Sequence, residues 1–223
     1  MADKERLSRE TMAFRVAKEF KDGMVVNLGI GIPTLCANYP SPDKEILYHT
    51  ENGALNFGPN ATPEEADLDL VNAGGQMVTT KPGMSLFAHD ESFAMIRGGH
   101  IDLCVLGAMQ VSEKGDLANW LLPERGIGSI GGAMDLAVSA KRLIVVTEHC
   151  TKDGKPKIVR KCAYELTAPE CVDMIVSDVA VIEVTDGGLV LKEMAPGWTA
   201  DEIQKLTEPE LILSPDLKEI ELM

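Results

Sequence analysis

Basic residues are scarce in this sequence of 223 residues, and so are paired cysteines and long hydrophobic runs. Lys and Arg number 21 against 35 Asp and Glu, which gives a formal net charge of −14. Nucleic acid binding needs a basic face that neutralises phosphates, so this composition argues against that role. A small phosphorylated ligand is still possible, because local cations and backbone N–H groups bind one inside an acidic protein.

The five cysteines show neither a CxxC nor a CxxH spacing, and their number is odd. We therefore expect no zinc site, no other metal site and no disulfide framework. Two of the cysteines stand in apolar stretches, which is typical of small core residues. The five are Cys36, Cys104, Cys150, Cys162 and Cys171.

No apolar run approaches the ~20 residues of a membrane span. The sequence opens with the charged residues Met-Ala-Asp-Lys-Glu-Arg, which lead into no signal-peptide core. We expect a cytoplasmic protein without a membrane segment, in which the thiols stay reduced.

The length fits one large domain or two small ones. Because the sequence has no internal repeat, no low-complexity tract and no linker-like change in composition, we expect a single domain over residues 1–214. An acidic tail over residues 215–223 follows it. The segment from residue 211 to the end carries acids and a proline, and we expect it to be partly ordered at best.

Short apolar strands alternate with short helical patterns along the chain, which predicts an α/β fold. We expect an open, mostly parallel sheet flanked by helices, with antiparallel hairpins at an edge. Helices are predicted over residues 7–21, 34–39, 92–96, 133–140 and 199–206. Strands are predicted over 24–28, 101–106, 143–147, 175–176, 179–184 and 189–192, with hairpins over 77–88 and 111–116.

One stretch, Tyr-His-Thr-Glu-Asn-Gly at residues 48–53, follows an apolar pair and ends in a turn signal. Its Glu51 therefore stands at the carboxyl end of a short strand, where ligands bind in α/β folds. The alternative is a solvated surface carboxylate before an ordinary turn. His49 points to the opposite strand face from its neighbours, and we interpret it as structural.

Two glycine turns have the order strand, glycine turn, helix. Gly29 and Gly31 follow the first predicted strand, and Gly131 and Gly132 precede the helix at Ala133. Such turns let a ligand approach the backbone at a helix start. The first lacks the third glycine of a dinucleotide motif and the Lys-Ser/Thr pair of a Walker motif. A tight turn without a ligand is the alternative for both.

These motifs recur with others in an ordered series, and together they resemble the β subunit of the family I (3-oxoacid type) coenzyme A transferases. The resemblance runs from about residue 7 to about residue 214. Thr50 replaces the usual serine and keeps its hydroxyl, whereas residues 54–59 depart from the usual aliphatic and glycine residues. The blocks that carry it are residues 27–34, 50–53, 90–100, 106–111, 115–120, 131–136 and 148–152.

The resemblance implies an α/β fold shared with sugar-phosphate isomerases, and a transfer of coenzyme A from a short-chain acyl-CoA or 3-oxoacyl-CoA to a free carboxylic acid. It implies that Glu51 is the nucleophile and carries a glutamyl-CoA thioester in a ping-pong cycle. Coenzyme A is then a substrate, with no tightly bound cofactor. It also implies an α subunit that completes the site, in a heterodimer or an α2β2 assembly, and a place in ketone body or short-chain fatty acid metabolism.

Within this interpretation, Gly131 and Gly132 are candidate oxyanion-hole donors, because a glycine loop at a helix start offers free N–H groups. Gly29, Gly31 and Asn52 are candidate contacts to coenzyme A. Tight packing explains the glycines equally, and a turn-forming role explains the asparagine.

Two other functions remain open. A sugar-phosphate isomerase would need a cluster of Lys and Arg beside the carboxylate, and no such cluster adjoins Glu51 in the sequence. A non-catalytic regulatory subunit would not need the intact Glu-Asn-Gly motif. The acid pair is also open among acetate, butyrate, acetoacetate, succinate and 3-oxoadipate.

Overall fold

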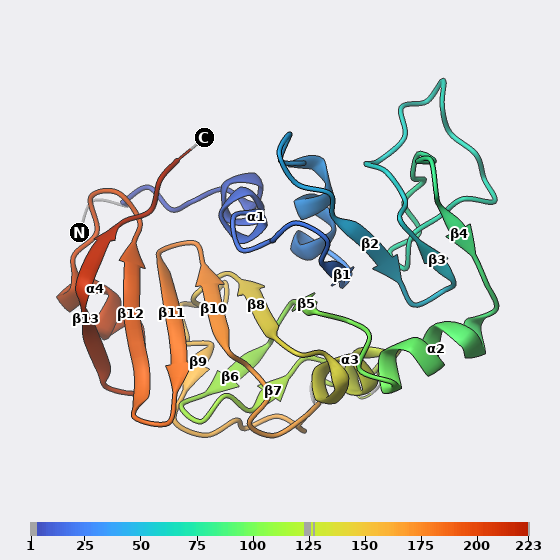
Figure 1. Ribbon diagram of the computed structural model, residues 1–223. Helices are drawn as coiled ribbons and strands as arrows, with labels where there is room; N and C mark the ends of the chain where they lie inside the picture. The colour runs from blue at the N-terminus through green and yellow to red at the C-terminus, as the bar shows by residue number, and fades with distance from the viewer. Residues whose placement is uncertain (1–3, 123–125, 127, 223) are drawn as a thin grey trace.

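The computed structural model describes residues 4–122, 126 and 128–222. These residues form a ten-stranded sheet with helices on both faces and a separate three-stranded sheet (Figure 1). The helices are α1 (Arg9–Ala17), the 3-10 helix η1 (Ile32–Asn38), α2 (His89–Arg97), α3 (Ala133–Ser139) and α4 (Ala200–Lys205). The strands are β1 (Val25–Leu28), β2 (Leu47–Thr50), β3 (Ala54–Leu55), β4 (Ser85–Leu86), β5 (Leu103–Leu106), β6 (Gln110–Ser112), β7 (Leu117–Ala118), β8 (Leu143–Thr147), β9 (Ile158–Val159), β10 (Met174–Ser177), β11 (Ala180–Thr185), β12 (Gly188–Met194) and β13 (Leu211–Glu219).

The large sheet has the order β13-β12-β11-β10-β8-β5-β1-β2-β3-β4. Its central strands, from β10 to β2, are parallel to one another. Antiparallel pairs flank them, at β3 and β4 on one side and at β11 and β12 on the other. The predicted open, mostly parallel sheet with antiparallel edge hairpins is confirmed.

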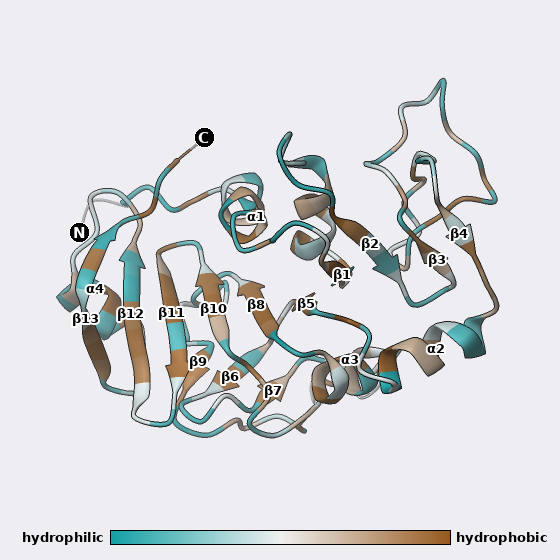
Figure 2. Cartoon of the chain, viewed as in Figure 1, coloured by the Kyte–Doolittle hydropathy of each residue, from teal (hydrophilic) through white to brown (hydrophobic). Residues whose placement is uncertain are grey.

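Successive side chains of the central strands point to opposite sides of the sheet, and the side chains on both sides are buried. Along β5, Leu103 and Val105 join the apolar cluster that includes α1 and η1. Cys104 and Leu106 join the cluster that includes α2 and α3. Figure 2 shows hydrophobic residues along the central strands and hydrophilic ones in most of the connecting loops. Two helical layers are therefore needed to cover this sheet.

The first helix is fixed at its start by a cap and along its length by a buried ion pair. Ser8 caps α1 by accepting from the Thr11 N–H. Arg15 donates to both carboxylate oxygens of Glu193 on β12, at 2.7 and 3.0 Å. This two-pronged bond joins α1 to a strand far away in the sequence.

The predicted hairpin over residues 111–116 is also confirmed. Strands β6 and β7 form the expected hairpin, and β11 and β12 form another around residues 186–187. At the start of α4, Glu202 Oε2 accepts from the Thr199 N–H at 2.9 Å, which is one half of a capping box. No helix in the described ranges has the length and apolar character needed to cross a membrane.

The expected hairpin between residues 77–80 and 85–88 is wrong. Strand β4 pairs with β3 instead, and Phe87 N–H donates to Gly53 O at 3.0 Å. Residues 77–79 turn back on the loop before them, where Val78 N–H donates to Leu70 O. A turn signal at residues 81–83 marks a change of direction but does not select the partner, which is fixed here by the β2–β3 turn.

The expectation of a poorly ordered end is also wrong for residues 211–219. They form β13, which pairs in parallel with β12 at the sheet edge. Leu211 and Ile220 are buried and anchor its two ends. Pro215 is tolerated because an edge strand leaves one row of N–H groups unpaired. The predicted domain boundary after residue 214 falls inside this strand.

Two buried histidines predict how stability depends on pH. Burial lowers the pKa of His49 and of His149 to about 4 in each case, below the ordinary 6.5. The unfolded chain therefore binds more protons than the folded one below pH 6.5, and stability falls as the pH drops from 6.5 towards 4. Each histidine contributes up to about 3 kcal/mol to this loss.

We expect the melting temperature to be clearly lower at pH 5 than at pH 7, as measured by scanning calorimetry. Replacing His149 by Gln should lower the melting temperature at pH 7 and reduce the drop between the two pH values. A variant with the same drop as the wild type would contradict the assignment of this titration to His149.

Candidate active site

A pocket of about 320 Å³ lies at the carboxyl ends of the neighbouring parallel strands β5, β1 and β2. The chain leaves β1 at Gly29, β2 at Glu51 and β5 at Gly107, and all three residues line the pocket. From β1 the chain proceeds to β2 on one side, and it returns later to β5 on the other. Ligands bind at such a reversal of strand order in open α/β sheets.

The turn that carries Glu51 can only be made with glycine at position 53. Gly53 has φ of +121°, and an added Cβ would lie 2.2 Å from the carbonyl oxygen of Phe87. Its N–H donates to Thr50 O at 3.0 Å, which closes the turn between β2 and β3. The Gly of the Glu-Asn-Gly motif is therefore a packing requirement.

The residues on either side of Glu51 use their side chains to fix this turn. Thr50 is buried, donates to Asn52 Oδ1 at 2.7 Å and accepts from Ala73 N–H at 2.9 Å. Asn52 Nδ2 donates to Val71 O at 2.8 Å. Threonine thus supplies the hydroxyl expected at position 50, while the amide of Asn52 is engaged with its own loop. Contact of Asn52 with coenzyme A stays a prediction.

The carboxylate of Glu51 is partly buried and incompletely paired. Its Oε2 is shielded from solvent and has no hydrogen-bond partner among the described residues. Leaving a buried acceptor without a donor costs about 1–3 kcal/mol, and more for a charged group. Such a group is often functional. The alternative of an ordinary solvated carboxylate does not fit this burial.

Gly132, at the start of α3, lies directly against Glu51. A Cβ added to Gly132 would lie 3.4 Å from Glu51 Cγ and 3.5 Å from Cδ. Gly131, with φ of +52°, lines the same pocket. Neither of their N–H groups donates to the backbone of another described residue. The predicted neighbours Glu51, Gly131 and Gly132 are therefore together, and the oxyanion-hole role stays a prediction.

The other glycine turn is only partly in the pocket. Gly29 lines it, but its N–H donates to Val105 O at 2.9 Å, and an added Cβ would lie 2.9 Å from Leu106 Cδ2. Its position is thus set by close packing of β1 on β5. Gly31 caps η1 with φ of +94° and is not among the described lining residues. Contact of either glycine with coenzyme A stays a prediction.

The described lining contains no Lys or Arg, and no thiolate is available below it. Cys104 is buried beneath Glu51, and burial, with a smaller contribution from the Glu51 charge, raises the pKa of its thiol well above the ordinary value. Within the described ranges, no three His, Cys, Asp or Glu side chains gather as a metal site requires. Glu51 is the ionisable side chain among the described lining residues.

Sequence reasoning missed Phe93 and Asn119. Phe93 Cζ lies 3.1 Å from the point where Gly132 would carry a Cβ, so the Phe93 ring and Glu51 both approach this glycine. Asn119 lines the pocket and donates to Gly107 O at 3.1 Å. Both stand inside the sequence blocks that carry the family resemblance, but no spacing connects them to Glu51. The contact of Phe93 with the Gly132 position arises because α2 and α3 pack side by side.

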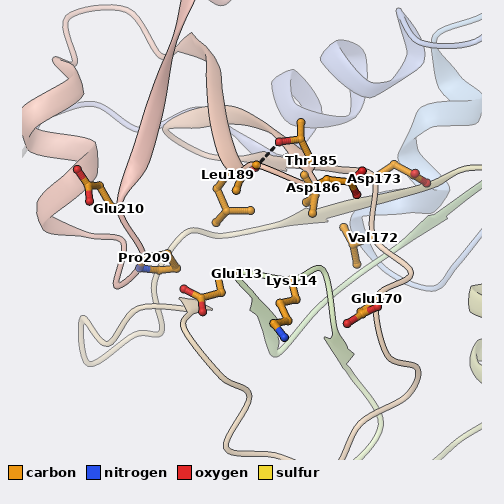
Figure 3. A pocket seen from close by; sticks show the side chains of 13 residues that line it. Glu113, Lys114, Glu170, Val172, Asp173, Thr185, Asp186, Leu189, Pro209 and Glu210 are labelled. Atoms are coloured by element: carbon orange, nitrogen blue, oxygen red, sulfur yellow. Dashed lines mark hydrogen bonds between the residues drawn. The ribbon is translucent and has the colours of Figure 1, made fainter.

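A larger pocket, of about 700 Å³, lies between the β6–β7 and β11–β12 turns (Figure 3). Its lining residues are distant from Glu51 in the sequence. Five acidic side chains line it and one lysine, Lys114, faces them. A polyanion such as coenzyme A would be repelled there. The acidic residues are Glu113, Glu170, Asp173, Asp186 and Glu210.

Residues 9–206 match the family model described as coenzyme A transferase. Succinyl-CoA:3-ketoacid coenzyme A transferase 2, mitochondrial, from Homo sapiens is 51% identical over 219 residues, which cover 97% of this chain and 42% of that protein. One subunit of the 3-oxoadipate CoA-transferase from Pseudomonas putida is 51% identical over 208 residues, which cover 93% of this chain and 97% of that polypeptide. This chain belongs to the coenzyme A transferase family, and the predicted resemblance to its β subunits is confirmed.

The chain spans about two fifths of the length of the mammalian relatives that it matches, and nearly all of the bacterial relative. Among solved structures, the YdiF acyl-CoA transferase apoenzyme from Escherichia coli O157:H7 has a TM-score of 0.77 at 22% identity, covering 99% of this chain and 44% of that one. Glutaconate coenzyme A-transferase from Acidaminococcus fermentans has a TM-score of 0.72 at 16% identity, covering 99% and 92%. These likenesses show a common fold.

Proposed function

We propose that this chain is the β subunit of a 3-oxoacid type coenzyme A transferase, which moves coenzyme A from an acyl-CoA to a free carboxylic acid through a thioester on Glu51. The single observation that carries this proposal is the Glu51 carboxylate, whose Oε2 is buried and has no hydrogen-bond partner among the described residues. A carboxylate is a weak nucleophile in water, and withdrawal from water strengthens it.

In the first half-reaction, a Glu51 oxygen attacks the thioester carbonyl of the donor acyl-CoA. The carbon–sulfur bond breaks, coenzyme A leaves as a thiolate, and a mixed anhydride joins the acyl group to Glu51. The thiolate then attacks the Glu51 carbonyl, which releases the donor acid and forms the glutamyl-CoA thioester. Each bond that forms resembles the one that breaks, so the cycle consumes no other reactant.

In the second half-reaction, the acceptor carboxylate attacks the glutamyl carbonyl and expels the thiolate, which then attacks the acceptor's side of the new anhydride. Glu51 regains its carboxylate and the new acyl-CoA leaves. Each addition develops an oxyanion. The N–H groups of Gly131 and Gly132 are our candidates to stabilise it, each worth about 3 kcal/mol by comparison with oxyanion holes elsewhere.

The substrates we propose are 3-oxoacids, because the names of both relatives contain a 3-ketoacid or a 3-oxoacid. An α subunit completes the site, in line with the bacterial relative, whose name describes it as one subunit of a transferase. We place the assembly in the cytoplasm, in line with the five free cysteines. A sugar-phosphate isomerase is disfavoured, because the described lining around Glu51 offers no cation for a phosphate.

Replacing Glu51 by Gln keeps the side-chain shape and removes the nucleophile. In the enzyme co-expressed with its α partner, we expect exchange of labelled acid into acyl-CoA to fall by more than about 10³-fold. Glu113→Gln, which removes an equal charge on the β6–β7 turn, should keep the wild-type rate. Exchange by Glu51→Gln at the wild-type rate would contradict the role of Glu51.

Replacing Gly132 by Ala tests the space beside the carboxylate. The backbone at Gly132, with φ of −88° and ψ of 3°, accepts alanine, so the fold should be retained. The new methyl group would lie 3.1 Å from Phe93 Cζ and 3.4 Å from Glu51 Cγ, so a neighbour has to shift by a few tenths of an ångström. We expect kcat to fall on the order of tenfold, because a misplacement of about 1 Å costs about 10²-fold elsewhere and this shift is smaller.

The matched control is Gly187→Ala, whose added methyl group would meet only Thr185 Oγ1, at 3.7 Å. It should retain the wild-type kcat. Steady-state rates and melting curves of both variants provide the comparison. A Gly132→Ala enzyme with wild-type kcat would show that this surface takes no part in the reaction.

A further inference from the structure

We propose that His49 is a positioning residue, which holds helix α2 through Ser92 so that the Phe93 ring shields Glu51 from water. This inference rests on the proposed function, because shielding matters only if Glu51 carries a thioester. Its basis is a chain of buried contacts that runs from the sheet, under the Glu51 turn, to α2.

The chain of contacts joins four elements. Asn27 on β1 donates through Nδ2 to His49 Nδ1 on β2, at 2.9 Å. The second ring nitrogen of His49 contacts Ser92 Oγ on α2, at 3.0 Å. Cys104 on β5 donates through Sγ to Asn27 Oδ1, at 3.9 Å. All four side chains are at most 1% exposed, so each depends on these partners for its polar atoms.

These partners also fix which ring nitrogen of His49 carries the proton. An amide Nδ2 only donates, so the Nδ1 that faces it accepts. Burial lowers the pKa of His49 to about 4, which keeps the ring neutral near pH 7. The remaining proton is therefore on Nε2, and Nε2–H donates to Ser92 Oγ. A neutral ring in one tautomer donates a hydrogen bond of fixed direction from β2 to α2.

His49 supports the entry to α2 as well as its first turn. Its ring stacks on Phe87, with centroids 6.1 Å apart and planes 18° apart. Phe87 precedes α2 and donates its N–H to Gly53 O in the Glu51 turn. The Glu51 turn and the start of α2 are therefore held to the same histidine.

Phe93 follows Ser92 directly, so the placement of Ser92 also sets where the Phe93 ring meets Gly132. A Cβ added to Gly132 would lie 3.1 Å from Phe93 Cζ and 3.5 Å from Glu51 Cδ. The ring is held on its flanks by His89, at 4.7 Å between centroids, and by Arg97, at 5.7 Å from the guanidinium carbon. The Phe93 ring and the Glu51 carboxylate thus flank the same glycine at the start of α3, and in our proposal the ring limits the approach of water from that side.

The shielding has a chemical purpose in this cycle. A glutamyl-CoA thioester must react with an acceptor carboxylate and resist water. If water attacks the Glu51 carbonyl, the carbon–sulfur bond breaks, Glu51 regains its carboxylate, and a proton from water ends on the coenzyme A thiolate. The product is free coenzyme A in place of acyl-CoA. Excluding water suppresses this side reaction.

The experiment measures, in the enzyme co-expressed with its α partner, acyl-CoA hydrolysis without acceptor and exchange with acceptor. The informative quantity is their ratio. Phe93→Ala should raise the ratio at least tenfold, and Phe93→Leu should raise it less. Ser92→Ala, which removes the partner of His49, should raise it several-fold with little change in the KM for acyl-CoA.

The matched control is Thr207→Val, which removes the hydroxyl that contacts the other buried histidine, His149, at 2.9 Å. It should lower the melting temperature about as much as Ser92→Ala does and keep the wild-type ratio. Phe93 is only partly buried, so its variants remain informative if Ser92→Ala fails to fold.

A wild-type ratio in Phe93→Ala would overturn the shielding, and a wild-type ratio in a folded Ser92→Ala would overturn the positioning by His49. Neither result would contradict the proposed function, provided that Glu51→Gln abolishes the exchange that the wild-type enzyme performs. An enzyme that exchanges without Glu51 would overturn the proposed function, and this inference with it.

Discussion

The buried oxygen of Glu51 is the constraint on which the rest of this site depends. A carboxylate that is shielded from water and lacks a donor costs free energy, and the surrounding fold has to keep it there. One device is the turn itself, in which residue 53 has to be glycine. The other is the pair of side chains beside Glu51: Thr50 donates to Asn52, and Asn52 donates to Val71 O in the next loop. Glu51 itself is left free of such bonds through Oε2 among the described residues.

The parallel sheet explains why this carboxylate faces other useful groups. Strands β5, β1 and β2 end side by side, so residues distant in sequence meet at one edge. Buried polar contacts below the edge, through Asn27, His49 and Ser92, link the strands to α2. Close glycine contacts above it, at Gly29 and Gly132, let backbone approach where a side chain would collide. Rigid strands and tight glycine packing thus hold a reactive group in one geometry.

Sequence periodicity predicted the architecture well because it is a local property of each strand and helix. It also placed Glu51 at a strand end, and the glycines before α3 at a helix start. It failed where pairing partners are distant: β4 pairs with β3, and residues 211–219 complete the sheet edge as β13. Phe93 was missed for the same reason, since its contact with Gly132 exists only after α2 and α3 pack together.

The central claim is that coenzyme A becomes covalently attached to Glu51 during turnover. The most direct measurement is mass spectrometry of peptides from the αβ enzyme quenched with acyl-CoA and no acceptor. The account predicts a coenzyme A adduct on the peptide that contains Glu51, lost when an acceptor acid is added. Turnover at the full rate with no adduct on that peptide, or with the adduct on another residue, would contradict it.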